Sequence, residues 1–247
     1  MERLVANSGV LYVRASLRPL SEQIKSQGNL LNFLESKIDF SEIIAPHFYG
    51  SRPFWRKRQH PNLMKTKSGA LGTSIRKIEG SALSTHPSHA FVGIGPQVSR
   101  ILQDHNQEKH CFAPIQELVE DCDFSMLLIG CLNESPGFST VHASQELLGL
   151  TRLHLERYLY RWDFADGVKL KTKIAPESPG CSRSFDKFYQ LYRDDNNLIS
   201  GDWEGVSWIY IQSARNAMKV EREILTANPR FVNCGNLKCT TCSLRFY

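Results

Sequence analysis

Short apolar runs divide the chain into segments that read as buried strands, with more polar segments between them. The runs at residues 9–17, 90–95 and 125–130 are compact and mostly apolar, which is typical of strands inside a sheet. Residues 20–34 differ, because their leucine and isoleucine residues recur near helical spacing and therefore predict a helix. Pro96 predicts the start of another helix, since proline fits the first helical turn.

The rest of the chain continues this mixture of strands and helices. Strands are predicted over residues 157–163, 168–174 and 205–211, and helices over residues 141–150, 185–194 and 213–228. Residues 46–61 form an irregular segment rich in aromatic and basic side chains. Without an internal repeat or a low-complexity linker, the pattern indicates one α/β (α+β) domain over residues 1–230, with a central mixed sheet flanked by helices. Residues 231–247 form a cysteine-rich C-terminal tail.

Composition narrows the class of protein. The 247 residues are 41% hydrophobic and 22% charged, values of an ordinary globular protein that argue against extensive disorder. No run approaches the roughly eighteen apolar residues of a bilayer-spanning helix, so no membrane partner is expected. The first eight residues lack the apolar segment and cleavage site of a signal peptide, so the cytoplasm is the expected location.

The net charge of +5 favours an anionic partner. Nucleic acid, a nucleotide sugar and coenzyme A all fit, and charge alone does not separate them. The basic, aromatic stretch from Arg52 to Arg58 could bind RNA or a nucleotide. Such a stretch is more often a solvated loop, so nucleic acid is not the favoured partner. The sequence leaves the oligomeric state open and is compatible with a homo-oligomer.

Four blocks, in order along the chain, carry a resemblance to a known family. Residues 10–17 read Val-Leu-Tyr-Val-Arg-Ala-Ser-Leu, and residues 68–71 read Ser-Gly-Ala-Leu ahead of Arg76. Residues 84–91 read Ser-Thr-His-Pro-Ser-His-Ala-Phe, and residues 127–130 read Leu-Leu-Ile-Gly ahead of Thr140 and His142. These blocks resemble the aminoglycoside 3-N-acetyltransferase (antibiotic N-acetyltransferase) family. The resemblance implies that family's fold and its transfer of an acetyl group from acetyl-CoA to an amine.

Several positions depart from the family's pattern. Arg14 stands where the family has a histidine, and Ala15 where it has a serine. Leu83 replaces an arginine, and Gln145, followed by Glu146, stands where an acidic residue usually comes three positions after the histidine. These differences leave the predicted fold unchanged, but they weaken the prediction of the substrate and of catalytic activity.

His142 is the residue that the resemblance assigns to proton transfer. Acetyl transfer to an amine needs a base that takes the amine's proton. Ser139 or Thr140 is a suitable N-cap, which would place His142 in the first turn of a helix. The positive end of the helix dipole would disfavour imidazolium and keep the ring neutral, as a base must be. The alternative is a histidine that only packs at that position.

Further site residues follow from the same resemblance. A carboxylate from a later strand should orient the histidine, and Glu177 is the acidic residue in that region. His86 is a second candidate for proton transfer, while His89 and Glu134 are expected to face the acceptor. Structural hydrogen bonds from either ring are an equally open reading. Metal binding by His86 and His89 is disfavoured, because no nearby carboxylate or cysteine is expected to complete the ligand set.

The cosubstrate implied by the resemblance is acetyl-CoA. The turn after the first strand should contact it, which corresponds to Arg14, Ser16 and Leu17, with Ser84 close by. An arginine at position 14 adds a permanent cation that suits a phosphate. No phosphate-cradling GxGxxG or GxxxxGK[ST] motif is present, so nicotinamide cofactors and ATP gain no support.

Three cysteines near the C-terminus stand apart from the acetyltransferase pattern. Cys234, Cys239 and Cys242 have C-x4-C-x2-C spacing. They could hold zinc or an iron–sulfur cluster with a fourth ligand from elsewhere in the chain. Free thiols or a redox pair are equally compatible with the spacing. The total of seven cysteines is odd, so a complete disulfide framework is not expected.

The sequence therefore predicts an N-acetyltransferase that acts on a small-molecule amine. Aminoglycosides are polycationic and favour acidic pockets, whereas this chain is basic and Glu134 is the one clear acidic residue near the motifs. A nucleotide-linked amino sugar, which is anionic, suits the charge better. Two alternatives remain: an aminoglycoside acetyltransferase that gives antibiotic resistance, and a non-catalytic binding protein that kept the fold.

Overall fold

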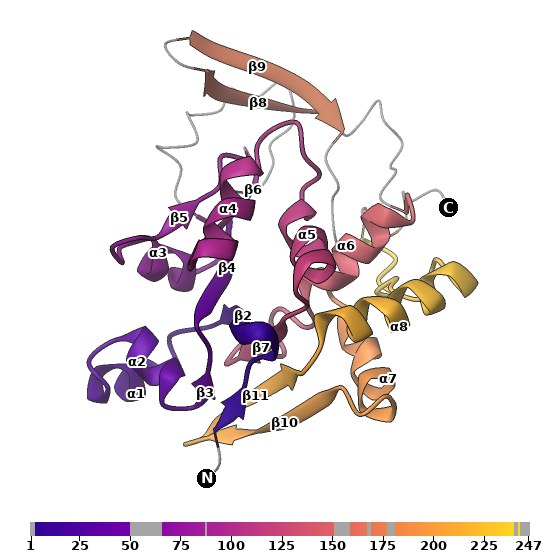
Figure 1. The fold of residues 1–247 in the computed structure, drawn as a ribbon. Helices are drawn as coiled ribbons and strands as arrows, with labels where there is room; N and C mark the ends of the chain where they lie inside the picture. The colour runs from indigo at the N-terminus through magenta and orange to yellow at the C-terminus, as the bar shows by residue number, and fades with distance from the viewer. Residues whose placement is uncertain are drawn as a thin grey trace.

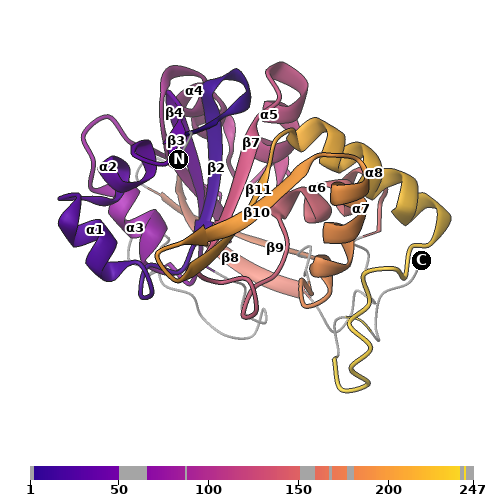
Figure 2. The same ribbon diagram turned by 90° about the horizontal axis from the view of Figure 1, so that it is seen from below.

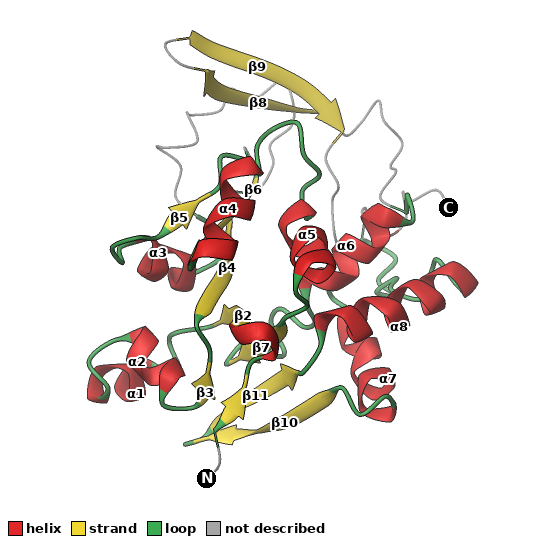
Figure 3. Cartoon of the chain, viewed as in Figure 1, coloured by secondary structure: helices red, strands yellow, loops and turns green. Residues whose placement is uncertain are grey.

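The computed structural model describes residues 3–49, 66–86, 88–150, 159–166, 169–176, 181–239 and 242. Strands and helices alternate along most of this chain (Figure 3). The strands are β1 (Leu4–Val5), β2 (Val10–Ala15), β3 (Ile38–Asp39), β4 (Glu42–Phe48), β5 (Ala82–Leu83), β6 (His89–Ile94), β7 (Ser125–Ile129), β8 (Leu159–Asp166), β9 (Lys169–Pro176), β10 (Leu198–Trp203) and β11 (Val206–Ile211). The helices are η1 (Asn7–Gly9), α1 (Ser21–Ser26), α2 (Leu30–Glu35), α3 (Ala70–Arg76), α4 (Pro96–Asp104), α5 (Ala113–Asp121), α6 (Ser139–Leu147), η4 (Phe185–Lys187), α7 (Phe188–Asp194) and α8 (Ala214–Ala227).

The main sheet has seven strands in the spatial order β10-β11-β7-β2-β4-β6-β5. The central strands β7, β2 and β4 run parallel, and the remaining neighbours pair antiparallel. The sheet is therefore mixed, which confirms the predicted fold class. Strands β1 and β3 form a small parallel pair, and β8 and β9 form an antiparallel hairpin that lies apart from the main sheet (Figure 1).

Helices cover both faces of the main sheet. Figure 2 shows α1, α2 and α3 on one side of it and α6, α7 and α8 on the other. Along β2, Leu11 and Val13 pack in the core under the first group, whereas Val10 and Tyr12 pack in the core under the second. Because neither face of the central strands meets water, apolar residues are favoured at every position. This two-sided burial explains the short, unbroken apolar runs in the sequence.

The helix predicted over residues 20–34 is wrong as one element. The chain forms α1 and α2 instead, separated at Gly28, which adopts a φ of +85° that favours glycine. Asn29 then caps α2, since its side-chain oxygen accepts a hydrogen bond of 3.0 Å from the backbone N–H of Asn32. A Gly-Asn pair inside a helical pattern is the local signal for this break.

Five strands of the structure are absent from the elements that the sequence pattern predicts: the two-residue strands β1, β3 and β5, and two longer ones. The first of the longer strands is β4, which includes residues 46–48, predicted to be irregular, and whose Pro46 lies opposite Phe91 of β6. The parallel ladder with β2 ends at Ile44, so the missing N–H of Pro46 removes no bond from that ladder. The second is β10, which joins β11 through a tight turn at Glu204 and Gly205, both with positive φ.

The C-terminal tail begins inside the packed body. Val232 has no exposed surface and belongs to the core under α7 and α8, and the Phe231 ring packs 5.1 Å from that of Phe188. The domain boundary after residue 230 stays a prediction. Within the described residues, no helix is long and apolar enough to cross a bilayer.

Shortening a buried side chain of the central strand β7 should destabilise the fold strongly. Leu128 is fully buried in the core between the sheet and the second group of helices, so Leu128→Ala should lower the free energy of unfolding by about 2–5 kcal/mol. Urea unfolding monitored by circular dichroism measures this change. Leu237→Ala is the matched control, because that side chain is 97% exposed and its loss should have little effect. Equal effects of the two substitutions would contradict the assignment of β7 to the core.

Candidate active site

A pocket of about 400 Å³ opens at the end of the main sheet where the parallel strands terminate. The carboxyl ends of parallel strands meet at one edge, which is the usual ligand site of open α/β sheets. Arg14 and Ala15 come from the end of β2, Phe48 from the end of β4, and Cys131 from the segment after β7. The complete described lining is Arg14, Ala15, Pro46, Phe48, Lys67, Ser68, Leu71, His89, Cys131 and Ser135.

The described lining combines cations with apolar surface. Arg14 and Lys67 are its permanently charged side chains, and among the described lining residues no carboxylate accompanies them. Arg14 also donates to the Gly137 carbonyl and to the Ser135 hydroxyl, so it fixes the loop that precedes α6. The pocket thus offers positive charge next to the apolar side chains of Ala15, Pro46, Phe48 and Leu71.

His142 lies in the first turn of α6, as predicted, but the predicted cap is wrong. The N-cap residue is Phe138, with no side-chain capping bond. The Ser139 hydroxyl instead bonds the Tyr12 hydroxyl at 2.6 Å, and Thr140 donates to Glu221. Both hydroxyls that the sequence predicts as helix caps therefore bond residues that are distant in the chain.

The His142 ring is held by aromatic contacts that lead to the pocket. Its centroid lies 4.9 Å from that of Phe112, in a stacked arrangement, and 4.7 Å from that of Phe185. The Phe112 ring in turn lies 5.2 Å from His89, which lines the pocket. Sequence reasoning missed Phe112 and Phe185, because neither belongs to the recognised motifs.

Gln145 is a hydrogen-bond partner of His142. The Nδ1 atom of His142 lies 3.1 Å from the Oε1 atom of Gln145, one helical turn along α6. An amide oxygen only accepts, so Nδ1 carries the proton and Nε2 carries the lone pair that a general base needs. Gln145 is fully buried, and among the described residues its amide nitrogen has no hydrogen-bond partner. This chain therefore orients its histidine with a neutral amide where the family pattern has an acid.

A buried carboxyl group anchors α6 to two other helices. Glu221 of α8 has no exposed surface and accepts hydrogen bonds from Thr140 at 2.6 Å, Ser144 at 2.7 Å and Tyr192 at 2.5 Å. Thr140 and Ser144 flank His142 on α6, and Tyr192 belongs to α7. Burial raises the pKa of Glu221 to about 7, although the three hydroxyl donors act in the opposite direction.

Glu146 holds the ring that stacks on His142. Its carboxylate accepts from the backbone N–H of Phe112 at 3.1 Å and from the Gln116 side chain at 3.3 Å. Burial raises the pKa of Glu146 to about 7, and the Phe112 N–H and nearby His89 partly oppose the shift. Glu146 therefore connects α6 to the start of α5 beside the imidazole.

The loop before α6 requires glycine at position 137. Gly137 has a φ of +75°, and a Cβ atom there would lie 2.1 Å from the Cβ of Phe185. Its N–H donates to the Tyr189 hydroxyl at 2.7 Å, and its carbonyl accepts from Arg14. The backbone at this glycine thus ties Arg14 of the pocket to Phe185 beside His142.

The comparisons with known proteins agree with this geometry. The model of the family described as aminoglycoside 3-N-acetyltransferase matches residues 3–226. The chain belongs to that family. The predicted family and the predicted enzyme class, an acetyl-CoA-dependent N-acetyltransferase, are confirmed. No curated protein sequence matches the chain significantly.

Solved structures of similar fold include members of the same family. The apoenzyme of aminoglycoside acetyltransferase AAC(3)-IVa superposes with a TM-score of 0.70 at 18% identity, covering 96% of this chain and 89% of that chain. A mutant of AAC(3)-IVa in complex with a gentamicin gives 0.69 at 16% identity, over 92% and 85% of the two chains. AAC-IIIb in a binary complex with CoASH gives 0.66 at 13% identity, over 89% and 90%.

The acetyltransferase gathers only part of its predicted site around the pocket. Arg14 and His89 line it directly, and the exposed Glu134 adjoins the lining residue Ser135. Ser16 and Leu17 follow β2 and are half-buried, with the N–H of Ser16 donating to Ile129. Glu177 and the stretch from Arg52 to Arg58 lie outside the described residues, so their predicted roles stay predictions.

Ser84 and His86 are engaged inside the protein. The Ser84 hydroxyl accepts from the N–H of Phe91 at 2.9 Å and lies 3.0 Å from Nδ1 of His105. Burial lowers the pKa of His105 to about 4, so its ring is neutral; Nε2 donates to the His110 carbonyl and Nδ1 accepts from Ser84. The His86 Nδ1 atom accepts from the N–H of His89 at 3.0 Å. The predicted roles of Ser84 with CoA and of His86 with the proton stay predictions.

Cys111 joins the two histidines of the third motif. Ligand atoms of His86, His89 and Cys111 lie within 4.8 Å of one another. The expectation that no nearby cysteine accompanies the pair is wrong, because folding brings Cys111 to the two histidines from a distant position in the chain. The Nδ1 atom of His86 accepts from backbone N–H groups within the same motif.

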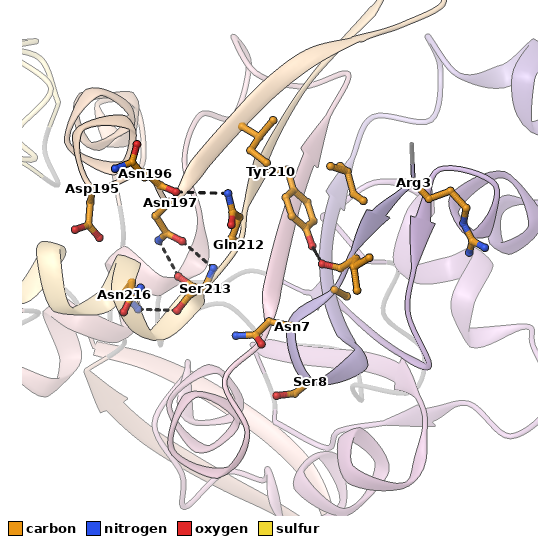
Figure 4. A pocket seen from close by; sticks show the side chains of 14 residues that line it. Arg3, Asn7, Ser8, Asp195, Asn196, Asn197, Tyr210, Gln212, Ser213 and Asn216 are labelled. Atoms are coloured by element: carbon orange, nitrogen blue, oxygen red, sulfur yellow. Dashed lines mark hydrogen bonds between the residues drawn. The ribbon is translucent and has the colours of Figure 1, made fainter. Parts of the chain in front are cut away.

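A second pocket, of about 690 Å³, lies away from these residues (Figure 4). Its polar side chains bond one another or the backbone: Asn197 and Ser213 exchange bonds of 2.9 and 2.8 Å, and the Tyr210 hydroxyl donates to the Val5 carbonyl. No predicted site residue is among its described lining. These bonds join the N-terminal segment to the loops around β10 and β11.

The pKa of Glu221 predicts how stability responds to pH. Because folding raises this pKa from 4.5 to about 7, the folded state binds the proton more tightly, and stability is lost as the pH rises between these values. The neutral variant Glu221→Gln should lack this loss, so its unfolding free energy should gain about 3 kcal/mol relative to wild type from pH 4.5 to 7.5.

Urea unfolding across this pH range measures the difference between the two proteins. Glu223→Gln on the same helix is the matched control, because that side chain is exposed and its substitution should leave the pH dependence unchanged. Parallel stability curves for wild type and Glu221→Gln would show that the carboxyl group titrates normally in the fold.

Proposed function

We propose that this protein transfers the acetyl group of acetyl-CoA to an amino group of a small anionic molecule, with a nucleotide-linked amino sugar as the favoured acceptor. Family membership over residues 3–226 supports the reaction class. The observation that supports an anionic acceptor is the pocket lining, where Arg14 and Lys67 are present and no carboxylate is among the described residues. Cations of this kind attract phosphate or pyrophosphate groups.

In this proposal His142 is the general base. The amine nitrogen attacks the thioester carbonyl, the carbon–sulfur bond breaks, and the thiolate of CoA leaves. The Nε2 atom of His142 takes the amine proton and later gives it to that thiolate. Gln145 is a positioning residue that holds Nδ1–H toward its amide oxygen.

Acetyl-CoA suits the described pocket residues. Ala15, Pro46 and Leu71 provide apolar surface for the pantetheine arm. Arg14 and Lys67 can pair with the phosphates of CoA or of the acceptor, and the kinetics of Lys67→Gln described below separate these two uses. When bound, the cosubstrate supplies the activated acetyl thioester. The chain's own residues contribute the cations, the pocket wall and the imidazole.

An aminoglycoside is the second candidate acceptor. The mutant AAC(3)-IVa structure that is similar in fold holds a gentamicin. On this chain the exposed Glu134 beside the pocket could face an ammonium group. The two candidates carry opposite charge, so a panel of acceptors separates them. Neither would be acetylated by a non-catalytic member of the family.

His142→Ala should abolish transfer. Release of the free CoA thiol, followed with a thiol reagent over a panel of aminoglycosides and nucleotide-linked amino sugars, should fall about 10²–10⁴-fold relative to wild type because the base is gone. His142→Gln keeps most of the side-chain volume between Phe112 and Phe185 and should show the same loss. His110→Ala, an exposed histidine, is the control and should retain activity.

Three results would contradict parts of the proposal. Retained transfer by a folded His142→Ala protein would remove the assignment of the base. Transfer to aminoglycosides only would replace the favoured acceptor. No transfer to any amine, together with no binding of acetyl-CoA, would support the non-catalytic alternative.

Lys67→Gln should weaken binding without slowing chemistry. Loss of an exposed cation beside the pocket should raise KM for the anionic substrate about fivefold and leave kcat nearly unchanged. The backbone bond of 2.6 Å from Lys67 N–H to Phe48 is kept in this variant. Lys77→Gln, an exposed lysine just after α3, is the control. Steady-state kinetics shows whether the KM of acetyl-CoA or of the acceptor rises, and no change in either would exclude Lys67 from binding.

A further inference from the structure

Four cysteine side chains converge where the C-terminal tail meets the segment before η4. The three cysteines of the C-x4-C-x2-C sequence, Cys234, Cys239 and Cys242, are joined by Cys181. All four sulfur atoms lie within 4.8 Å of one another. Two pairs are closer, with 3.7 Å between Sγ of Cys239 and Cys181 and 3.7 Å between Sγ of Cys242 and Cys234.

These separations match one metal ion better than disulfides. Four thiolates at about 2.3 Å from a tetrahedral zinc ion lie about 3.8 Å from one another, close to the two shorter separations. A disulfide needs about 2.05 Å between sulfur atoms. An iron–sulfur cluster must place several irons and sulfides between its thiolates, which four sulfurs gathered this closely do not accommodate. We propose that Cys181, Cys234, Cys239 and Cys242 bind one Zn²⁺ ion in a closed, structural site.

The remaining cysteines support the selection of these four. Cys111, Cys122 and Cys131 lie on other parts of the fold, and among the described residues they join no group of four potential ligands. A site with four thiolate ligands leaves no position for substrate or water, so the ion serves the fold and takes no part in acetyl transfer. The sequence supplied three of the ligands, and the fold supplied the fourth.

The zinc ion would crosslink the C-terminal tail to the segment before η4, which lies next to the candidate active site. Cys181 lies shortly before Phe185, whose ring packs 4.7 Å from that of His142. A second contact runs in parallel: Nζ of Lys187 donates to the carbonyls of Phe231 and Asn233 at 2.9 and 3.0 Å. The ion therefore crosslinks the tail to the segment that carries Phe185. This consequence rests on the proposed function, whereas the zinc site itself does not.

Metal analysis of the full chain tests the site without reference to activity. Protein produced in zinc-supplemented medium, with any affinity tag removed, should contain about one zinc ion per chain by mass spectrometry. Cys181→Ser and Cys239→Ser should lose most of this zinc. Cys122→Ser is the matched control, because this partly buried thiol is distant in sequence from the ligands, and it should keep the full content.

Measurements on the wild-type chain keep the test decisive if the variants fold poorly. Replacement of zinc by Co²⁺ should produce the intense visible absorption and the sulfur-to-cobalt charge-transfer bands of a tetrahedral tetrathiolate site. After denaturation with chelator and without reductant, all seven cysteines should react as free thiols. Loss of zinc to a chelator should also lower the melting temperature.

Other outcomes would overturn the proposal. Protein that holds no zinc and shows three reactive thiols in place of seven would contain two disulfides. Iron with visible absorption after anaerobic purification would replace zinc by an iron site. Zinc retained by both Cys181→Ser and Cys239→Ser would place the ion elsewhere. None of these results depends on acetyl transfer, so a failed activity assay leaves the test of the metal site intact.

Discussion

Glu221 is a carboxyl group without exposed surface at the junction of α6, α7 and α8. Its three hydroxyl donors come from two of these helices, and two of them flank His142 on α6. Burying this carboxyl group without hydrogen-bond partners would cost folding free energy. The bonds to Thr140, Ser144 and Tyr192 therefore favour one arrangement of the three helices. The position of the imidazole relative to the sheet depends on this interaction, because the predicted capping hydroxyl Thr140 is committed to it.

The residues around His142 differ from the family pattern. Gln145 contacts Nδ1 of the ring with a neutral amide, where the pattern has an acid. Glu146 reaches back to the backbone of Phe112 and thereby sets the ring that stacks on the imidazole. The acidic side chain of Glu146 therefore positions the ring beside the imidazole, and the amide of Gln145 contacts the imidazole itself.

Charge distinguishes the pocket of this chain. Arg14 lies where the family pattern has a histidine, lines the pocket and braces the loop that holds Gly137. The same guanidinium can serve both roles because it has five N–H donors in a fixed plane. The backbone of Gly137 then approaches Phe185 too closely for any side chain, which couples the cationic side of the site to the imidazole side. Cys181 of the cysteine cluster lies just before Phe185 in the chain, so the segment around Phe185 contacts the cluster, Gly137 and the His142 ring.

The sequence by itself determined the family, the mixed α/β class, the central strands β2 and β7, and the positions of α4, α6, α7 and α8. The central strand β4 and the helices α3 and α5 were not predicted. Runs such as residues 125–130 are apolar on both faces of the strand, and this pattern can be recognised from the local sequence alone. Gly28 and Asn29 carried a local signal for the break between α1 and α2 that a purely periodic reading overlooks. The short edge strand β10 and the proline-containing end of β4 lacked such patterns, because their pairing depends on neighbours distant in sequence.

Only the tertiary structure decided which side chains meet. Thr140 looked like a helix cap but bonds Glu221, which lies 81 positions away in the chain. Cys181 is 58 positions from Cys239, and Phe112 is separated from His142 by all of α5 and β7. Local sequence records the preference of each residue for helix, strand or turn. Hydrogen bonds, ring contacts and thiol clusters form between surfaces that folding brings together, so their partners are fixed only when the sheet and its helices are packed.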